Sequence, residues 1–376
     1  MNLTESDISA PSSDELEVVL FGPGYGEAIV CHVGAGNWII VDSCLDPSTG
    51  EPATISYLKR IGVDVERQVK RIIITHFDED HIKGIASTVQ YCKIAKVVVS
   101  QAFKKEEFWI YVTDGSGEPL IGGRGEFSRL AKAEARWIFA GDNKRVFGLE
   151  SPDSGHGQSV QIWTKSPSSG QILESMAALA SGMRAARSDV ISARKRILRN
   201  DLSVVSWIDC GFFRILLGAD LQVSSNPAMG WGAVVSDHLS SDGKAGMFKV
   251  PHHGSQTGHS EAVWDALLHP MPVTFISPWR LARQSLPTAA DVQRILLKAP
   301  DAHITVTAPP RRRGFSRDVD RLLRRLPGFA AAEIPMGALR FRCKPTDAAV
   351  SVAPIGGSAG RLDKFNAQEF GKRWTA

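Results

Sequence analysis

The stretch Thr75-His76-Phe77-Asp78-Glu79-Asp80-His81-Ile82-Lys83-Gly84 decides how this chain is interpreted. It carries two histidines and three carboxylates within six residues, directly after the apolar residues 72–74. A β-rich run that ends in such a cluster predicts a strand that delivers metal ligands to a loop. Imidazole and carboxylate together favour Zn, Mn or Fe over Ca, which prefers oxygen ligands. The competing interpretation is a solvated acidic loop before a helix, and this segment alone does not exclude it.

The bulk composition is that of an ordinary globular protein, with 43% apolar and 22% charged residues in 376. That length allows two domains, although large α/β folds of this size are often single units. The net charge of +4 permits an anionic partner without requiring one. Five scattered cysteines without C-x-x-C spacing predict reduced thiols in a cytoplasmic protein. We see no signal peptide and no apolar run long enough to span a membrane.

The pattern of apolar runs and turn residues predicts two strand-rich blocks with interleaved helices. Expected strands cover residues 17–21, 27–32, 38–42, 71–75, 96–100, 202–208, 212–217, 247–250, 273–277, 304–308 and 338–343. Expected helices cover residues 53–61, 82–91, 261–268, 289–298 and 317–326. In such α/β folds, binding residues gather where strands end.

Three more expected strands end in histidine or aspartate. Asp42 follows residues 39–41, Asp220 follows residues 214–219, and His252-His253 follows Lys249-Val250-Pro251. Taken singly, an aspartate after a strand is usually a helix cap or turn former, and a histidine pair is usually a surface feature. Four such strand ends in one chain together predict a dinuclear metal site.

These segments resemble a known family. His76-Phe77-Asp78-Glu79-Asp80-His81 resembles the H-x-H-x-D-H signature of the metallo-β-lactamase superfamily, with aspartate in place of the middle histidine. The form H-x-D-x-D-H is closer to the soluble domain of ComEC/Rec2-type DNA-uptake proteins. Segments similar to the other motifs of that group are Gly22–Ala28, Asn200–Val205, Leu217–Asp220 and Lys249–Ser255. The resemblance implies an α/β fold, namely a four-layer αββα sandwich of two mixed β-sheets with outer helices.

The resemblance also implies two divalent metal ions, with zinc or manganese expected and iron as a third option. The implied ligands are His76 and Asp78 for the first ion, Asp80, His81 and His252 for the second, and Asp220 as the bridge. An aspartate at position 78 adds an anionic oxygen donor, which shifts the preference from zinc toward manganese or iron.

Further roles are implied for residues around these ligands. Asp80 would also orient an attacking metal-bound hydroxide, and His253 would donate to a substrate phosphate or leaving oxygen. Asp42 would orient the ligand loop from behind. Asn200 and Ser203 would lie behind the ligands or against the substrate.

Two departures from the family pattern affect the first metal site and the substrate side. The separate ligand histidine that the family has before the bridging aspartate is not evident. Asn200 and Asp201 stand nearest in order, and His156 is a poorer candidate. The His-Pro dipeptide that often follows the second histidine motif is replaced here by Leu286-Pro287.

The expected domain organisation is a flexible N-terminus over 1–15, a metallo-β-lactamase-like hydrolase domain over 16–345, and a linker and tail over 346–376. Insertions are expected near 101–150 and 168–199. Arginine-rich segments at 184–199 and 311–325 suggest a surface that follows phosphates, although for the second segment a solvated helix face is the favoured interpretation.

Three functions remain open from the sequence. The first is a metal-dependent phosphodiesterase or nuclease that acts on nucleic acid or another phosphodiester. The second is a hydrolase of a small substrate such as a nucleotide, phosphocholine ester, lactone or β-lactam. The third is a non-catalytic partner module that retains the fold. No membrane partner is expected.

Overall fold

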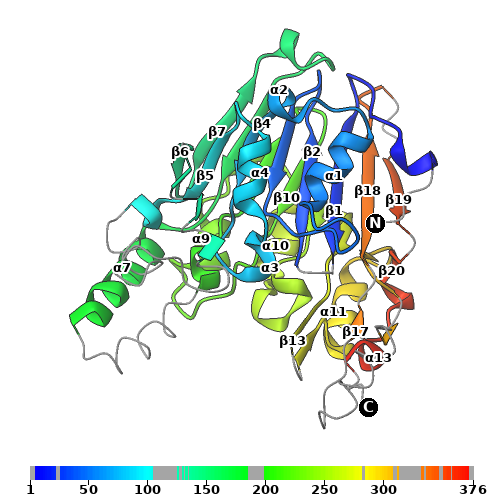
Figure 1. The fold of residues 1–376 in the computed structure, drawn as a ribbon. Helices are drawn as coiled ribbons and strands as arrows, with labels where there is room; N and C mark the ends of the chain where they lie inside the picture. The colour runs from blue at the N-terminus through cyan, green and yellow to red at the C-terminus, as the bar shows by residue number, and fades with distance from the viewer. Residues whose placement is uncertain are drawn as a thin grey trace, which may run out of the picture.

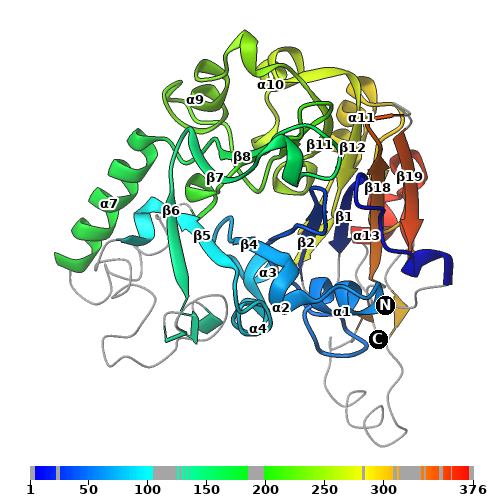
Figure 2. The same ribbon diagram turned by 90° about the horizontal axis from the view of Figure 1, so that it is seen from above.

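The computed structural model of the chain describes residues 5–371 apart from several gaps: 23–25, 105–124, 127–128, 131, 134, 185–198, 282–283, 308–310, 313–331, 334–335, 347–349 and 357. Two eight-stranded sheets lie face to face, and helices cover their outer faces (Figure 1). Seen from above, the four layers follow one another as helices α1 to α4, the first sheet, the second sheet, and helices α9 to α11 (Figure 2). The predicted αββα sandwich with two mixed sheets is confirmed.

The first sheet has the strand order β19-β18-β1-β2-β3-β4-β5-β6. Its strands are β1 (Leu16–Gly22), β2 (Ala28–His32), β3 (Trp38–Val41), β4 (Val69–Ile73), β5 (Lys96–Ser100), β6 (Arg136–Ala140), β18 (Gly337–Cys343) and β19 (Val350–Ile355). Strands β1, β2 and β3 form an antiparallel meander, and β3, β4, β5 and β6 run parallel. Parallel neighbours place their C-terminal ends at one edge of the sheet.

The second sheet repeats this plan with the order β20-β15-β12-β11-β10-β9-β8-β7. Its strands are β7 (Lys144–Leu149), β8 (Val160–Thr164), β9 (Ser206–Asp209), β10 (Arg214–Leu217), β11 (Ala245–Lys249), β12 (Leu268–Ile276), β15 (His303–Ile304) and β20 (Gly360–Arg361). Strands β7 to β10 are antiparallel, and β10, β11, β12 and β15 run parallel. Two short hairpins, β13–β14 (Trp279–Leu281, Gln284–Leu286) and β16–β17 (Arg311–Arg312, Ala332–Glu333), lie outside both sheets.

Three apolar clusters hold the layers together. The central cluster fills the space between the sheets with side chains such as Val18, Ile73 and Ile215. The outer clusters lie under the helices α1 (Ala53–Arg60), α2 (Val65–Gln68), α3 (Glu79–Ile82) and α4 (Ile85–Tyr91) on one side, and α9 (Gly230–Ser236), α10 (Glu261–Ala266) and α11 (Ala289–Lys298) on the other. Strands buried on both faces explain why their sequences are apolar without alternation.

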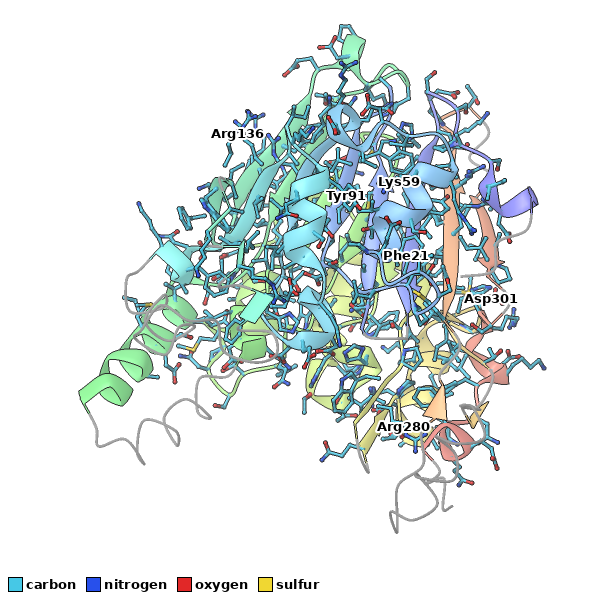
Figure 3. All side chains as sticks on the ribbon, viewed as in Figure 1. Phe21, Lys59, Tyr91, Arg136, Arg280 and Asp301 are labelled. Carbon is cyan, nitrogen blue, oxygen red and sulfur yellow. The ribbon has the colours of Figure 1, made fainter. Side chains whose placement is uncertain are left out.

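The surface of the first helical layer shows how the outer side chains finish this packing. Lys59 of α1 and Tyr91 of α4 both lie on this layer in Figure 3, and the Lys59 Nζ lies 4.0 Å from the centre of the Tyr91 ring. An ammonium over an aromatic face is attracted by the ring quadrupole. The contact therefore links helices α1 and α4 at the surface of this layer.

The chain after residue 345 differs from the expected linker and tail. Val350–Ile355 forms β19 and pairs with β18 along its whole length, and Gly360–Arg361 pairs with β15. Helix α13 (Ala367–Gly371) buries Phe370 in the outer cluster. The first half of the run that suggested a linker, residues 351–355, thus belongs to the edge strand β19.

Two other expected boundaries also differ in the structure. Residues 136–149, expected within an insertion, form the edge strands β6 and β7, while residues 105–124 lie outside the described part of the chain. The segment before residue 16 is tied to β18, because Arg340 donates to the Asp7 carbonyl at 3.0 Å. Helix α7 (Ser169–Arg184) projects from the sandwich in both ribbon views (Figures 1 and 2). The expected helix at 317–326 lies outside the described residues.

Candidate metal centre

Asp42 organises the ligand loop from the end of β3. Its Oδ1 accepts the Thr75 backbone N–H at 2.8 Å, and its Oδ2 accepts the Thr75 hydroxyl at 2.7 Å and the His81 Nδ1 at 2.7 Å. Because the Thr75 hydroxyl hydrogen is used on Asp42, His76 Nδ1 must donate to Thr75 Oγ1 at 2.9 Å. The Nε2 atoms of His76 and His81 therefore keep their lone pairs in the neutral tautomers, as metal ligands require.

Asp220, at the end of β10, lies opposite these histidines. Its Oδ2 lies 3.9 Å from His76 Nε2, 3.5 Å from His81 Nε2 and 3.4 Å from His253 Nε2. A single carboxylate oxygen thus faces three imidazole nitrogens. This geometry is what a bridging carboxylate between two cations needs.

The remaining carboxylates lie on the two sides of Asp220. Asp78 Oδ2 is 3.8 Å from His76 Nε2 on one side, and Asp80 Oδ2 is 3.2 Å from His253 Nε2 on the other. Ligand atoms of Asp80, His81, Asp220 and His253 all lie within 4.8 Å of one another. The structure therefore brings together five of the six residues for which the resemblance implies a ligand role.

The sixth, His252, is displaced from the cluster by its neighbour His253. His253 donates from Nδ1 to the Ser277 carbonyl at 3.0 Å, which turns its Nε2 toward Asp80 and Asp220. His252 instead lies near Asn200 at 3.2 Å through Nε2 and near Thr257 at 2.8 Å through Nδ1. The two histidines thus stand in the reverse of the expected positions: the His253 ring faces the cluster, and the His252 ring lies outside it.

Backbone conformation explains this exchange. His252 and His253 both have positive φ values, 48° and 51°, after the end of β11. Two successive left-handed residues end the alternation of side chains that an extended strand would continue. Asp42 at 60° and Ala219 at 48° are left-handed as well. Such non-glycine conformations cost energy and persist where the surrounding structure over-determines them, as at functional sites.

A buried ion pair between Glu27 and Lys249 lies next to the cluster. Neither residue was singled out from the sequence. Lys249 ends β11 and forms an ion pair with Glu27, the last residue of the loop before β2. The Lys249 side chain is 1% exposed and that of Glu27 3%. Both residues lie within the motifs that carry the family resemblance. That position is the sequence feature from which a role for them could have been predicted.

Burial and charge make the cluster a site that attracts positive charge. Burial lowers the pKa of His253, but the Asp220, Asp80 and Glu27 carboxylates outweigh it and raise that pKa to about 10. Burial also opposes the charged form of His81. Asp220 and Asp42 favour that form more strongly, so the pKa of His81 is raised well above its ordinary value. The pKa of Asp220 stays well below its ordinary value despite burial, because His253 and His81 face it.

The donor set fits divalent cations. Among the described residues, His76 Nε2 and His81 Nε2 are buried and have no hydrogen-bond partner, and both face Asp220 Oδ2. Buried polar atoms are nearly always paired, so two unpaired nitrogens that face the same oxygen indicate a missing partner. Nitrogen and carboxylate donors together suit Zn, Mn or Fe.

The other residues singled out from the sequence lie further from the cluster. The Asn200 side-chain amide lies 3.2 Å from His252 Nε2, and Ser203 is buried with its carbonyl accepting from the Ser166 hydroxyl at 2.5 Å. His156 packs against Phe212 with ring centres 5.1 Å apart. Asp201 has a pKa raised to about 6 by burial and by the charge of Glu174. Within the described residues, none of these replaces the missing family histidine as a ligand.

A cavity of about 320 Å³ opens on the far side of His252. Gln222 links the two, because it lines the cavity and its amide lies 3.1 Å from His252 Nδ1. Helix α7 contributes one face, and both Glu174 and Asp201 line the wall. The cavity is large enough for a small organic group beside the cluster.

Comparison with known proteins agrees with this geometry. Residues 22–166 match the model of the Metallo-beta-lactamase superfamily. Together with the two mixed sheets and the His/Asp cluster, the match identifies a protein of the metallo-β-lactamase fold. The matched residues are similar to that superfamily, whereas the finer ComEC-like grouping is not confirmed. No curated protein matches the sequence.

Solved structures with a related arrangement are distant. A mutant of CmlA beta-hydroxylase is 15% identical, with 68% of this chain and 38% of that chain covered and a TM-score of 0.35. A Cronobacter sakazakii metallo-beta-lactamase with a HARLDQ motif is 12% identical, with 52% and 53% covered and a TM-score of 0.30. YhfI from Bacillus subtilis, a metallo-beta-lactamase fold protein, is 12% identical, with 63% and 70% covered and a TM-score of 0.33. No function is inferred from likenesses this weak.

The remaining general expectations have simple outcomes. All five cysteines are buried and free, as expected of reduced thiols. In the part of the chain that the structure describes, no helix has both the length and the apolar character needed to cross a membrane.

Proposed function

We propose that this protein is a metal-dependent hydrolase that cleaves a phosphodiester. The observation that carries the proposal is the convergence of His76, His81 and His253 Nε2 on one oxygen of Asp220. His76 and Asp78 would hold one divalent ion, Asp80, His81 and His253 the other, and Asp220 both. When bound, such a pair of ions polarises a phosphoryl oxygen and lowers the pKa of water toward about 7.

The protein's own residues would orient this chemistry. Asp80 lies at the mouth of the cluster with a side chain 23% exposed, so it can accept a hydrogen bond from an attacking water while also binding an ion. Trp279 of the β13 hairpin stacks beside His253 with ring centres 6.2 Å apart, which limits access of bulk water from that side. His252 and Asn200 would contact the substrate.

Nucleic acid is the first candidate substrate, and its support comes from the sequence. The arginine-rich segments at 184–199 and 311–325 lie almost entirely outside the described residues. Basic segments of this kind follow a phosphate backbone in other nucleic-acid-binding proteins.

A small phosphoester is the second candidate, and the cavity beside His252 favours it. Its volume of about 320 Å³ suits a small organic group, and Glu174 and Asp201 on its wall would repel a polyanion. A small substrate would place its non-reacting part there.

The test combines metal analysis with three substrates. We expect bound Mn, Zn or Fe in the purified protein and hydrolysis of bis-p-nitrophenyl phosphate that is lost on chelation. We expect the Asp80→Ala/His81→Ala variant to lose activity by several orders of magnitude while remaining folded. Persistent activity in this variant would refute the metal mechanism. Cleavage of plasmid and single-stranded DNA at low salt would favour the first substrate, and intact DNA beside a cleaved ester the second.

A further inference from the structure

Lys249 is an unexpected residue beneath a site that attracts cations. Its ammonium is almost completely enclosed at the end of β11, and its Nζ lies 3.8 Å from Asp220 Oδ1. A buried ammonium costs several kcal/mol to desolvate and repels a nearby metal ion. Its presence therefore calls for a compensating role that a neutral side chain would not fill.

Lys249 contacts both the backbone next to the bridging aspartate and the side chain of that aspartate. Its Nζ donates to the carbonyl of Ala219 at 3.1 Å, and Ala219 holds the left-handed conformation that directs Asp220 inward. Asp220 then offers Oδ1 to the ammonium and Oδ2 to the three imidazoles. The lysine thus acts on both the backbone and the side chain of this turn.

Glu27 completes the arrangement from the opposite sheet. It forms the ion pair with Lys249, its backbone N–H donates to the Asp80 carbonyl at 2.8 Å, and its Oε2 lies 3.6 Å from His253 Nδ1. One residue therefore touches Lys249, the Asp80 loop and His253. Its negative charge also cancels the ammonium charge that a metal ion would otherwise meet.

We propose that the Glu27–Lys249 pair positions the metal centre. Lys249 determines which oxygen Asp220 presents to the metal ions, and Glu27 holds the Asp80 loop and His253 in place around that oxygen. Both act through the ligands rather than on the substrate, so they are positioning residues. The inference rests on the proposed metal centre, and it extends that centre to two residues to which no role was assigned.

The test replaces the pair as a unit. Removing one member leaves an uncompensated buried charge, so Glu27→Met and Lys249→Met alone should be strongly destabilised. The Glu27→Met/Lys249→Met double variant removes both charges at similar volume and should fold, since apolar replacements of buried pairs are often tolerated. Metal affinity, measured by chelator competition with Mn²⁺ and Zn²⁺, should nevertheless fall about 10–100-fold in the folded double variant.

A second buried pair offers a matched control. Arg342 Nε lies 2.6 Å from Glu17 Oε2, and Glu17 is fully buried between β1 and β18 at the other end of those strands. The Glu17→Met/Arg342→Met variant makes the same kind of change away from the ligands. It should leave metal affinity within about twofold of the native protein.

The outcomes separate this inference from the proposed function. Native protein that binds no metal would overturn both. If the native protein binds metal and the folded Glu27→Met/Lys249→Met variant binds it equally well, the positioning role alone is overturned. Should the double methionine variant not fold, Glu27→Gln/Lys249→Gln takes its place in the same titration. Failure of both double variants to fold would mean a purely structural pair and would count against the inference.

Discussion

Replacing Asp42 by asparagine should reverse the tautomers of His76 and His81, the two histidines of the ligand loop that we propose to bind metal, without disturbing the backbone. Asp42 has a φ of 60°, a left-handed conformation that aspartate and asparagine both adopt. Its Oδ1 accepts the Thr75 N–H, a backbone donor that cannot turn away. The asparagine oxygen should therefore take the Oδ1 position, and its amide nitrogen the Oδ2 position.

The consequence passes through Thr75 to both rings. An amide at the Oδ2 position donates to His81 Nδ1 and to Thr75 Oγ1, where the carboxylate accepted from both. His81 must then carry its proton on Nε2. The Thr75 hydroxyl becomes free to donate to His76 Nδ1, which moves the His76 proton to Nε2 as well. A protonated Nε2 cannot bind a metal ion.

The magnitudes follow from these contacts. Three charge-assisted hydrogen bonds become neutral ones, and each loses about 1 kcal/mol, so the free energy of unfolding should fall by about 1–3 kcal/mol. Metal affinity should fall about 10–100-fold, as for other partners that orient ligand histidines. Urea unfolding measures the first quantity and chelator competition with Zn²⁺ or Mn²⁺ the second.

Asp46→Asn is the matched control. Asp46 is also buried and accepts the Ser48 N–H and hydroxyl at 2.9 and 2.6 Å. It should lose stability but keep its metal affinity. Unchanged metal affinity in folded Asp42→Asn protein would refute the tautomer argument.

Further predictions concern backbone space, protons and pH. A Cβ on Gly26 would lie 1.6 Å from the Asp80 carbonyl oxygen, so Gly26→Ala should weaken metal binding. Gly62 also has a positive φ, +79° against +118° at Gly26, but open space at its Cβ position, so Gly62→Ala should cost stability only. Equal metal affinities in the two variants would contradict this. Because the pKa of His253 is raised to about 10, metal binding near pH 7 should release protons, about one to two per molecule, and calorimetry in buffers of different ionisation enthalpy will count them. Burial lowers the pKa of His32 to about 4, so the unfolded chain binds this proton first as the pH falls. Stability should drop by up to about 3 kcal/mol from pH 6.5 to 4, and a His32→Gln variant with the native pH profile in urea unfolding would disprove the assignment.

Much of the fold could be predicted because the sequences of the core strands are themselves typical of buried strands. Segments 96–100 and 289–298 have the same bounds in the sequence prediction and the structure, since strands buried on both faces and a helix with a capping box are defined locally. The edge strands β6, β7 and β19 were missed, and so was β8, which lies next to β7. Their residues are mixed in polarity, and only pairing with a neighbouring strand makes them part of a sheet.

Much of the candidate site could also be predicted from the sequence. Asp42, Asp220 and the loop from His76 to His81 could be placed at strand ends, and parallel strands bring such ends to one edge. Their union around Asp220 Oδ2 in the structure agrees with that expectation. The exchange of His252 and His253 was not readable, because two left-handed residues in succession are set by the packing around the turn.

The sequence by itself determined the residue types that a metal centre needs and the strands that carry them, because strand propensity and ligand chemistry are local properties. Only the tertiary structure decided which histidine faces the cluster and which charges support it. Glu27 and Lys249 lie far apart in sequence and on different sheets, and they meet because the sheets stack face to face. A buried ion pair depends on desolvation by the whole fold, and no local pattern encodes that burial.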